Sequence, residues 1–264
     1  MLRLGKKLKD DQRMNNRRVK LTLSYDGTNF QGWQIQKTGR TVQGVIEEGL
    51  TKMHKHSVRI TAAGRTDSGV HASGQVCHFD TNLQIAEPKL KFAVNTFLPD
   101  DISILSSVFV NDDFHARYNA KKRVYKYYLC DYFEYNVFNR MYCIPIRTMP
   151  NISDLNACVR SLVGIHDYTT FTAAGDKSES RIREIYSAVF YKEGSSTVFR
   201  IEGNAFLWKM IRSIVGTALK FAPMEEGPFL FKKVLESKDR KLAGPTAPAK
   251  GLFFHKVSYI GKLR

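Results

Sequence analysis

The sequence lacks any apolar stretch long enough to cross a bilayer. Its 264 residues contain no run of about 18 apolar residues, which is the length that a spanning helix needs. The start, MLRLGKKLKDDQRMNNRR, also lacks the apolar centre of a secretory signal peptide. No basic amphipathic segment stands apart from the rest. We therefore expect a cytoplasmic protein with no membrane partner.

Cysteine is scarce, and its spacing argues against two of its common uses. The four cysteines, Cys77, Cys130, Cys143 and Cys158, lie far apart and form no CxxC pair. No short Cys/His cluster of the kind that binds zinc is present, so we expect no metal site. Without an export signal, free and mostly buried thiols in a reducing compartment are expected rather than disulfides.

Acidic residues are few relative to basic ones. Lysine and arginine number 41 against 25 acids, which gives a formal charge of +16 and a pI of about 9.7. Basic side chains displace counterions from phosphates, so this charge favours a polyanionic partner. A lipid surface and a nucleic acid both carry phosphates. Because no membrane segment is visible, the sequence favours nucleic acid.

Apolar periodicity predicts a basic arm followed by two similar halves. Residues 1–17 have no apolar period and are predicted to form a solvated arm. Residues 18–115 predict the order strand, helix, strand, strand, helix, strand, and residues 116–264 predict that order again. This is the order of a ferredoxin-like unit. We therefore expect an α+β fold of two ferredoxin-like halves around a central cleft.

The individual elements follow from the same patterns. The predicted strands are 18–25, 58–62, 75–79, 102–110, 123–130, 182–191, 197–201 and 252–260. The predicted helices are 42–53, capped by Thr41, and 87–97, 152–163 and 205–221. Residues 132–149, 169–180 and 223–248 are predicted to be insertions. The last two contain Gly, Pro and charge, which is typical of mobile loops.

One loop combines several groups that can carry chemistry. Gly64 to Ala72 (GRTDSGVHA) brings together an arginine, a carboxylate, two glycines and a histidine between two short strands. By itself, the sequence around Asp67 is also typical of a tight turn, in which an aspartate is simply solvated. We interpret His71, at the start of a strand, as a structural hydrogen-bonding partner. A catalytic carboxylate in a water-poor site would need a cation beside it.

Arg212 is a candidate for that cation. In the predicted helix 205–221 the apolar residues form one face, and Arg212 lies at the edge of that face, one turn after Trp208. A wholly exposed arginine would lie opposite the apolar face. An arginine in this position could also snorkel to solvent or pair with some other acid, so the sequence leaves both interpretations open.

The segment KKRVYKYYL interleaves basic and aromatic residues. The strand period of two predicts Arg123, Tyr125 and Tyr127 on one face. An RNA base that leaves its helix is commonly held by stacking on an aromatic ring, so a tyrosine beside cations suits that role. Aromatic residues also fill the cores of ordinary strands, which is the alternative for each of these tyrosines.

The loop GRTDSGVHA resembles the catalytic loop of the TruA family of tRNA pseudouridine synthases. Five further blocks follow in the family's order. They are FHARY at 114–118, RVYKYYL at 123–129, GIHDYTTF at 164–171, GNAFLWKMIRSIVG at 203–216 and APAKGLFF at 247–254. Together with the loop they lie within residues 19–259, which is nearly the whole chain beyond the arm.

The resemblance assigns roles to four residues. It implies that Asp67 is the essential aspartate, that Arg212 pairs with it and that Tyr125 contacts the target base. Arg65 matches the arginine that helps to hold the flipped nucleotide. The resemblance also implies the pseudouridine synthase fold and a homodimer. The reaction neither gains nor loses atoms, so no redox cofactor is expected.

The resemblance also implies a substrate. The expected reaction is the conversion of uridine to pseudouridine at positions 38, 39 and 40 of the tRNA anticodon stem-loop. Relatives with the same loop modify other RNA sites, so a different address is one alternative. A non-catalytic RNA-binding module is a second, and a base-excising hydrolase is a third. The last would normally need a second carboxylate, and none lies near Asp67 in the sequence.

Overall fold

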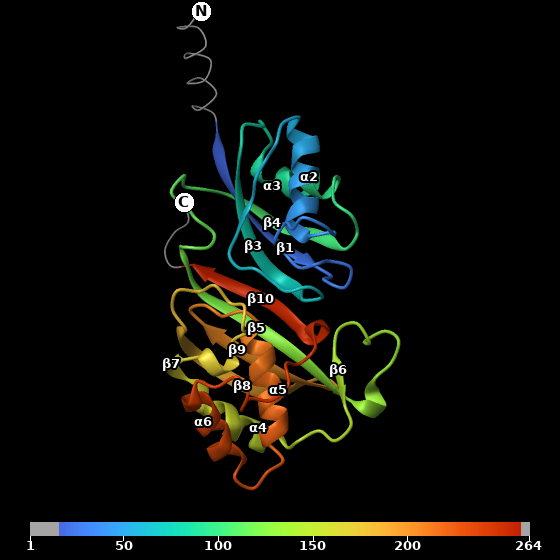
Figure 1. The fold of residues 1–264 in the computed structure, drawn as a ribbon. Helices are drawn as coiled ribbons and strands as arrows, with labels where there is room; N and C mark the ends of the chain where they lie inside the picture. Colours follow the sequence, from blue (N-terminus) through green and yellow to red (C-terminus); the bar gives the residue numbers. More distant parts are fainter. Residues whose placement is uncertain (1–15, 260–264) are drawn as a thin grey trace, which may run out of the picture.

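The computed structural model of the protein describes residues 16–259 (Figure 1). The predicted arm, residues 1–17, lies outside this range except for its last two residues, and Arg17 already belongs to the first strand. The strands are β1 Arg17–Tyr25, β2 Thr61–Ala62, β3 His71–Thr81, β4 Ile102–Val110, β5 Ala120–Asp131, β6 Ile144–Ile146, β7 Gly164–Asp167, β8 Ile182–Glu193, β9 Ser196–Gly203 and β10 Leu252–Tyr259. The helices are α2 Val42–His54, α3 Glu87–Asn95, α4 Ile152–Val159, α5 Met210–Phe221 and α6 Gly227–Ser237.

All these strands join one sheet in the order β4-β1-β3-β10-β5-β9-β8-β7, with β2 on β3 and β6 on β5. In the row β4-β1-β3-β2 each strand is antiparallel to its neighbour, and this is the strand order of a ferredoxin-like unit. The strands β10, β5, β9 and β8 repeat this arrangement, with β7 added at the edge. The predicted α+β fold of two ferredoxin-like halves is confirmed.

The two halves meet where β3 pairs with β10. This pairing is parallel and joins His71 to Phe253 and Ala72 to Phe254. Since β10 is the last strand within residues 16–259, the chain returns from the second half to form the seam. Gly74 makes the close approach possible, because a Cβ atom there would lie 2.2 Å from the carbonyl oxygen of His255.

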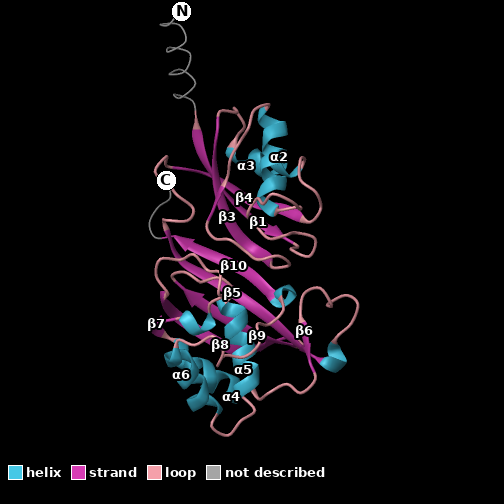
Figure 2. Cartoon of the chain, viewed as in Figure 1, coloured by secondary structure: helices cyan, strands magenta, loops and turns pink. Residues whose placement is uncertain are grey.

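The helices form two groups, with α2 and α3 beside the first half and α4, α5 and α6 beside the second (Figure 2). Helix α2 begins as the sequence predicts, because the Thr41 hydroxyl accepts the amide of Gly44. Its apolar face, which includes Val42, Ile46 and Leu50, is fully buried. The predicted boundary at residues 115 and 116 falls in the segment linking β4 to β5, and the division into domains stays a proposal.

Three local predictions are wrong. The predicted strand 58–62 is reduced to two residues in β2. The segment 223–248 is not simply a loop, since it contains α6, whose Phe231 and Leu235 are buried. The helix predicted from Ala205 begins at Met210, because Lys209 adopts the left-handed conformation with φ of 60°. Trp208 therefore lies before the helix that carries Arg212.

Substituting Gly74→Ala tests the seam. An added methyl group would meet the carbonyl oxygen of His255, so β3 and β10 must separate locally. We expect a loss of about 1–3 kcal/mol in the free energy of unfolding, measured by urea denaturation. The control Ser103→Ala lies on an exposed position of β4 and should change this free energy by less than about 0.5 kcal/mol. Equal effects of the two variants would contradict the close approach.

Candidate active site

The loop that carries Asp67 is held by the segment following β1. The backbone amide of Trp33 donates to the carbonyl oxygen of Thr66 at 3.1 Å. The hydroxyl of Ser68 donates to the carbonyl oxygen of Phe30 at 3.2 Å. These bonds fix the backbone on both sides of Asp67, so the carboxylate starts from a defined position.

Two glycines in that supporting segment allow the contact. A Cβ atom on Gly27 would lie 2.0 Å from the carbonyl oxygen of Val70. Gly32 has φ of 84°, and its Cβ would lie 2.6 Å from the carbonyl oxygen of Thr66. This segment, YDGTNFQGW at 25–33, is not among the predicted site residues. Two glycines among aromatic residues, between a strand and a helix, are the signal that could have identified it.

Asp67 and Arg212 form an ion pair between the two halves. The Nη1 atom of Arg212 donates to Oδ2 of Asp67 at 3.0 Å, and their side chains are 15% and 23% exposed. The Nε atom of Arg212 donates to the carbonyl oxygen of Ala247 at 2.7 Å. The guanidinium is therefore held on one side by the backbone and faces the carboxylate with the other.

The segment that holds Arg212 is packed directly on α5. A Cβ atom on Gly216 would lie 1.7 Å from the carbonyl oxygen of Pro245, so only glycine fits there. The amide of Gly244 donates to the hydroxyl of Thr217 at 2.9 Å. These contacts hold Ala247, the first residue of the APAKGLFF block, beside Arg212. The block thus supplies the carbonyl group that accepts the hydrogen bond from Nε of Arg212.

Tyr125 lies on β5 beside the pair and is 7% exposed. Its ring meets those of Phe206 and Phe254 edge-on, with centroids 5.1 and 4.6 Å apart. A Cβ atom on Gly64 would lie 3.8 Å from the Tyr125 hydroxyl oxygen, so this hydroxyl lies at the start of the Asp67 loop. Burial raises the pKa of Tyr125, and its phenol is therefore neutral at pH 7.

Arg65, the fourth predicted residue, is exposed. It makes no hydrogen bond or ion pair with other residues in the range 16–259. The structure thus brings Asp67, Arg212 and Tyr125 together, whereas Arg65 extends from the same loop toward solvent. A side chain with five donors and no protein partner is free to meet a ligand from outside.

His71 is buried and fully hydrogen-bonded. Its Nδ1 atom accepts the amide of Gly27 at 3.0 Å, and its Nε2 atom lies 3.0 Å from the carbonyl oxygen of Met141. Satisfying both contacts requires the proton on Nε2. Asp26 lies 3.1 Å from Nδ1, but burial lowers the pKa of His71, so the ring is neutral and this contact is no ion pair. The structural interpretation of His71 agrees with these bonds.

The predicted common face of Arg123, Tyr125 and Tyr127 is buried. Tyr127 is fully buried and its hydroxyl donates to the carbonyl oxygen of Pro248 at 2.7 Å. Arg123 is 9% exposed, and its guanidinium donates only to backbone carbonyl groups. Neither side chain is therefore available to stack on RNA. For Tyr127 the alternative of an ordinary core residue is the better description.

The insertion at 169–180, predicted to be mobile, is bonded through Asp176 to the segment just before α5. The amide of Trp208 donates to Oδ2 of Asp176 at 2.6 Å, and Arg181 pairs with the other oxygen. Burial by itself would raise the pKa of Asp176. The hydrogen bonds from Trp208, Ser178 and Arg181 outweigh it and lower the pKa to about 2.

Stability should therefore depend on pH through Asp176. A folded pKa of about 2 against an ordinary 3.8 corresponds to roughly 2 kcal/mol at pH 7. Because the folded pKa is the lower one, this stabilisation is complete above the ordinary pKa and is lost as pH falls toward 2. Urea unfolding should find Asp176→Asn less stable than the natural protein by about that amount at pH 7 and pH 5. The difference in the free energy of unfolding between the two proteins should be smaller at pH 3. A difference that does not change with pH would contradict the lowered pKa of Asp176.

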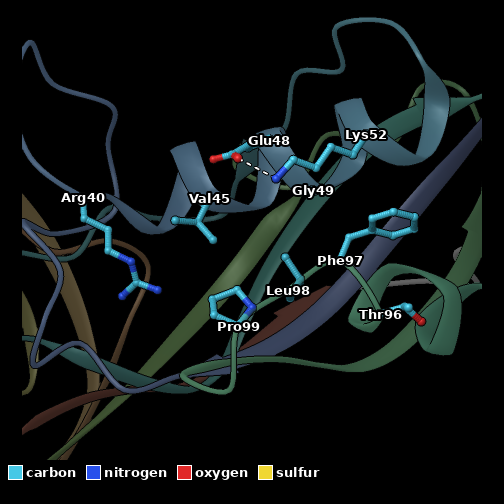
Figure 3. A pocket seen from close by; sticks show the side chains of 9 residues that line it. All are labelled: Arg40, Val45, Glu48, Gly49, Lys52, Thr96, Phe97, Leu98 and Pro99. Atoms are coloured by element: carbon cyan, nitrogen blue, oxygen red, sulfur yellow. Dashed lines mark ion pairs between the residues drawn. The ribbon is translucent and has the colours of Figure 1, made fainter.

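A pocket of about 500 Å³ lies away from these residues, between α2 and the loop after α3 (Figure 3). Its apolar wall includes Val45 and Leu98, and its charged groups are Arg40 and the pair of Glu48 with Lys52 at 2.7 Å. Glu48 and Lys52 form an exposed pair one helical turn apart, which is typical of a helix surface. None of the four predicted site residues lines this pocket.

Among residues 16–259, none of the helices has both the length and the apolar character that crossing a bilayer requires. Within the same range, no three His, Cys, Asp or Glu side chains gather closely enough to hold a metal ion. The four cysteines are free and buried.

Two ferredoxin-like units that share one sheet are consistent with the pseudouridine synthase fold, and here Asp67 and Arg212 pair across the seam of the two units. A family model described as tRNA pseudouridine synthase matches residues 22–119 and 158–260, which is more than half of the chain. The chain therefore belongs to the tRNA pseudouridine synthase family, whose members are isomerases.

Relatives named tRNA pseudouridine synthase A match along most of their length. The one from Geobacillus kaustophilus is 45% identical over 243 residues, covering 92% of this chain and 94% of the relative. The one from Borrelia hermsii is 42% identical over 243 residues, covering 92% and 99%. The one from Anoxybacillus flavithermus is 44% identical over 244 residues, again covering 92% and 99%. The resemblance predicted from the sequence blocks is confirmed.

Proposed function

We propose that this chain converts uridine to pseudouridine in tRNA and that Asp67 is its catalytic carboxylate. The observation that carries the proposal is the 3.0 Å ion pair of Asp67 with Arg212 across the seam, in a member of this family. Holding two charges partly away from water costs free energy. A role in the reaction accounts for that cost better than a role in stability does.

The reaction needs an ionised carboxylate. The bond from ribose C1′ to uracil N1 breaks, the base turns, C1′ bonds to C5, and the proton from C5 is replaced by one taken up at N1. A carboxylate can assist by attacking the sugar or by removing a ribose proton. Both routes use the ionised form of Asp67. The guanidinium of Arg212 donates to the carboxylate at 3.0 Å and fixes the direction in which it points.

Tyr125 and Arg65 have complementary roles in this proposal. Tyr125 is held edge-on between two phenylalanine rings, which fixes its neutral hydroxyl at the start of the Asp67 loop, and this hydroxyl is the group that we assign to the target base. Arg65 is an exposed cation two residues before Asp67. We assign it to a phosphate beside the flipped nucleotide, where its charge and planar donors suit the ligand.

The substrate address is a further part of the proposal. We propose uridines 38, 39 and 40 of the anticodon stem-loop, the positions that the TruA resemblance implies. The names of the relatives support tRNA as the substrate, and the charge of +16 supports a polyanionic partner. The homodimer and the cytoplasmic location stay predictions.

Substituting Asp67→Asn tests the chemistry. Release of tritium from tRNA that carries 5-tritiated uridine should fall by roughly a thousandfold or more, because the amide can neither attack nor accept a proton. Binding of tRNA should change little. The control Asp80→Asn removes the carboxylate of another arginine pair, that with Arg18, and should keep full activity.

Each alternative function predicts a different result in that assay. If the chain were a non-catalytic RNA-binding module, the natural protein would release no tritium from tRNA. A hydrolase would release free uracil, which chromatography of the products detects, instead of leaving pseudouridine in the chain. Tritium release that survives in Asp67→Asn would rule out Asp67 as the catalytic residue.

The address is tested in cells that lack the protein. Pseudouridines in their tRNA can be mapped by carbodiimide adducts and reverse transcription. We expect loss at positions 38, 39 and 40, with restoration by the natural gene and no restoration by Asp67→Asn. Loss confined to other positions would refute the address and leave the chemistry intact.

A further inference from the structure

Arg123 is a buried cation with no carboxylate partner among residues 16–259. It lies on β5 two residues before Tyr125 and is 9% exposed. Burying a charge is costly unless hydrogen bonds compensate it. The partners of Arg123 are therefore informative, because the fold must supply them at fixed positions.

All the partners are backbone carbonyl groups, and they come from three separate segments. Nε and Nη2 of Arg123 donate to the carbonyl oxygen of Ala63 at 3.1 and 3.0 Å. Nη2 also donates to Arg117 at 2.8 Å, and Nη1 donates to Asn204 at 2.5 Å and to Ala120 at 3.4 Å. One side chain thus fixes backbone positions that lie 60 and 81 residues away along the sequence.

These segments carry or adjoin the proposed site. Ala63 directly precedes the loop of Asp67. Asn204 directly precedes the stretch whose Phe206 packs on Tyr125 and which leads into α5. Arg117 lies in the connection between the two halves. The guanidinium of Arg123 therefore fixes the positions of three backbone segments relative to β5. These are the start of the Asp67 loop, the stretch that carries Phe206, and the connection between the two halves.

We propose that Arg123 is a positioning residue, whose guanidinium holds the Asp67 loop at the right distance from Tyr125 for the reaction. This inference rests on the proposed function. It explains why a charge is buried here without a counter-charge. A guanidinium has five donors in one rigid plane and can bind carbonyl groups on opposite sides, whereas a lysine ammonium offers three donors at one point.

Substituting Arg123→Lys tests the proposal, since it keeps the charge but removes the planar fork. We expect kcat for tritium release to fall by roughly 10- to 100-fold, because a misplacement of about 1 Å costs rates of this order. KM for tRNA should stay nearly unchanged, since Arg123 is not exposed to RNA. The matched control is Arg17→Lys. Arg17 also donates to backbone carbonyl groups, those of Leu83 and Ile85, and it should keep the natural kcat.

Hydrogen–deuterium exchange gives a readout that does not depend on activity. In Arg123→Lys, amides of residues 64–70 and 204–208 should exchange faster, while those of α2 and α6 exchange at the natural rate. Faster exchange throughout, together with a lower Tm, would reduce Arg123 to a structural role and overturn the proposal. Unchanged kcat and unchanged exchange would overturn it as well. If Arg123→Lys does not fold, Arg123→Gln takes its place with the same measurements.

The same experiment separates this inference from the proposed function. If the natural protein releases no tritium from tRNA, the proposed function fails, and the exchange pattern still decides whether Arg123 orders the two segments. If the natural protein is active and Arg123→Lys equals it in kcat, only the role of Arg123 fails.

Discussion

The parallel pairing of β3 with β10 holds the two halves in one sheet, and the candidate site is built around that pairing. The loop of Asp67 leads directly into β3. Tyr125 lies on β5, next to Phe254 of β10 in the sheet register. Because the pairing spans only two residue pairs, side-chain and loop contacts must complete the alignment of the halves. The Asp67–Arg212 pair and the guanidinium of Arg123 are two such contacts.

Two arginines at the seam show different uses of a guanidinium. Arg212 donates one hydrogen bond to a backbone carbonyl group and another to the carboxylate of Asp67, which is partly exposed to solvent. Arg123 directs all of its recorded bonds to carbonyl groups and is almost completely buried. The first arrangement leaves the proposed catalytic carboxylate partly exposed in a fixed direction. The second fixes the backbone around it. Because burying a charge is weak evidence for a gain in stability, we infer that the geometry is what these two arginines contribute.

Many of the local elements of this fold were predictable because the spacing of apolar residues along a short stretch of sequence indicates a helix or a strand. The strand at 102–110 has the predicted bounds, and α2 begins at the predicted Thr41 cap. The late start of α5 was not predictable, since the apolar pattern continues through Trp208 while the left-handed Lys209 and the bond from Trp208 to Asp176 interrupt the helix. Helix α6 was not predicted because the glycine, proline and charged residues at its ends are typical of a loop.

The sequence by itself determined the two-fold order of elements, the loop of Asp67 and, through the matching blocks, the family. Only the tertiary structure decided which groups meet. It brought Arg212 to Asp67 across 145 residues and turned Arg123 and Tyr127 inward. It also gave His71 its partners in two distant segments. The physical reason is that the partners of His71, Arg123 and Tyr127 are mostly backbone carbonyl and amide groups. Nearly every residue type carries these groups, so the pattern of side chains in the sequence does not indicate where such a partner lies.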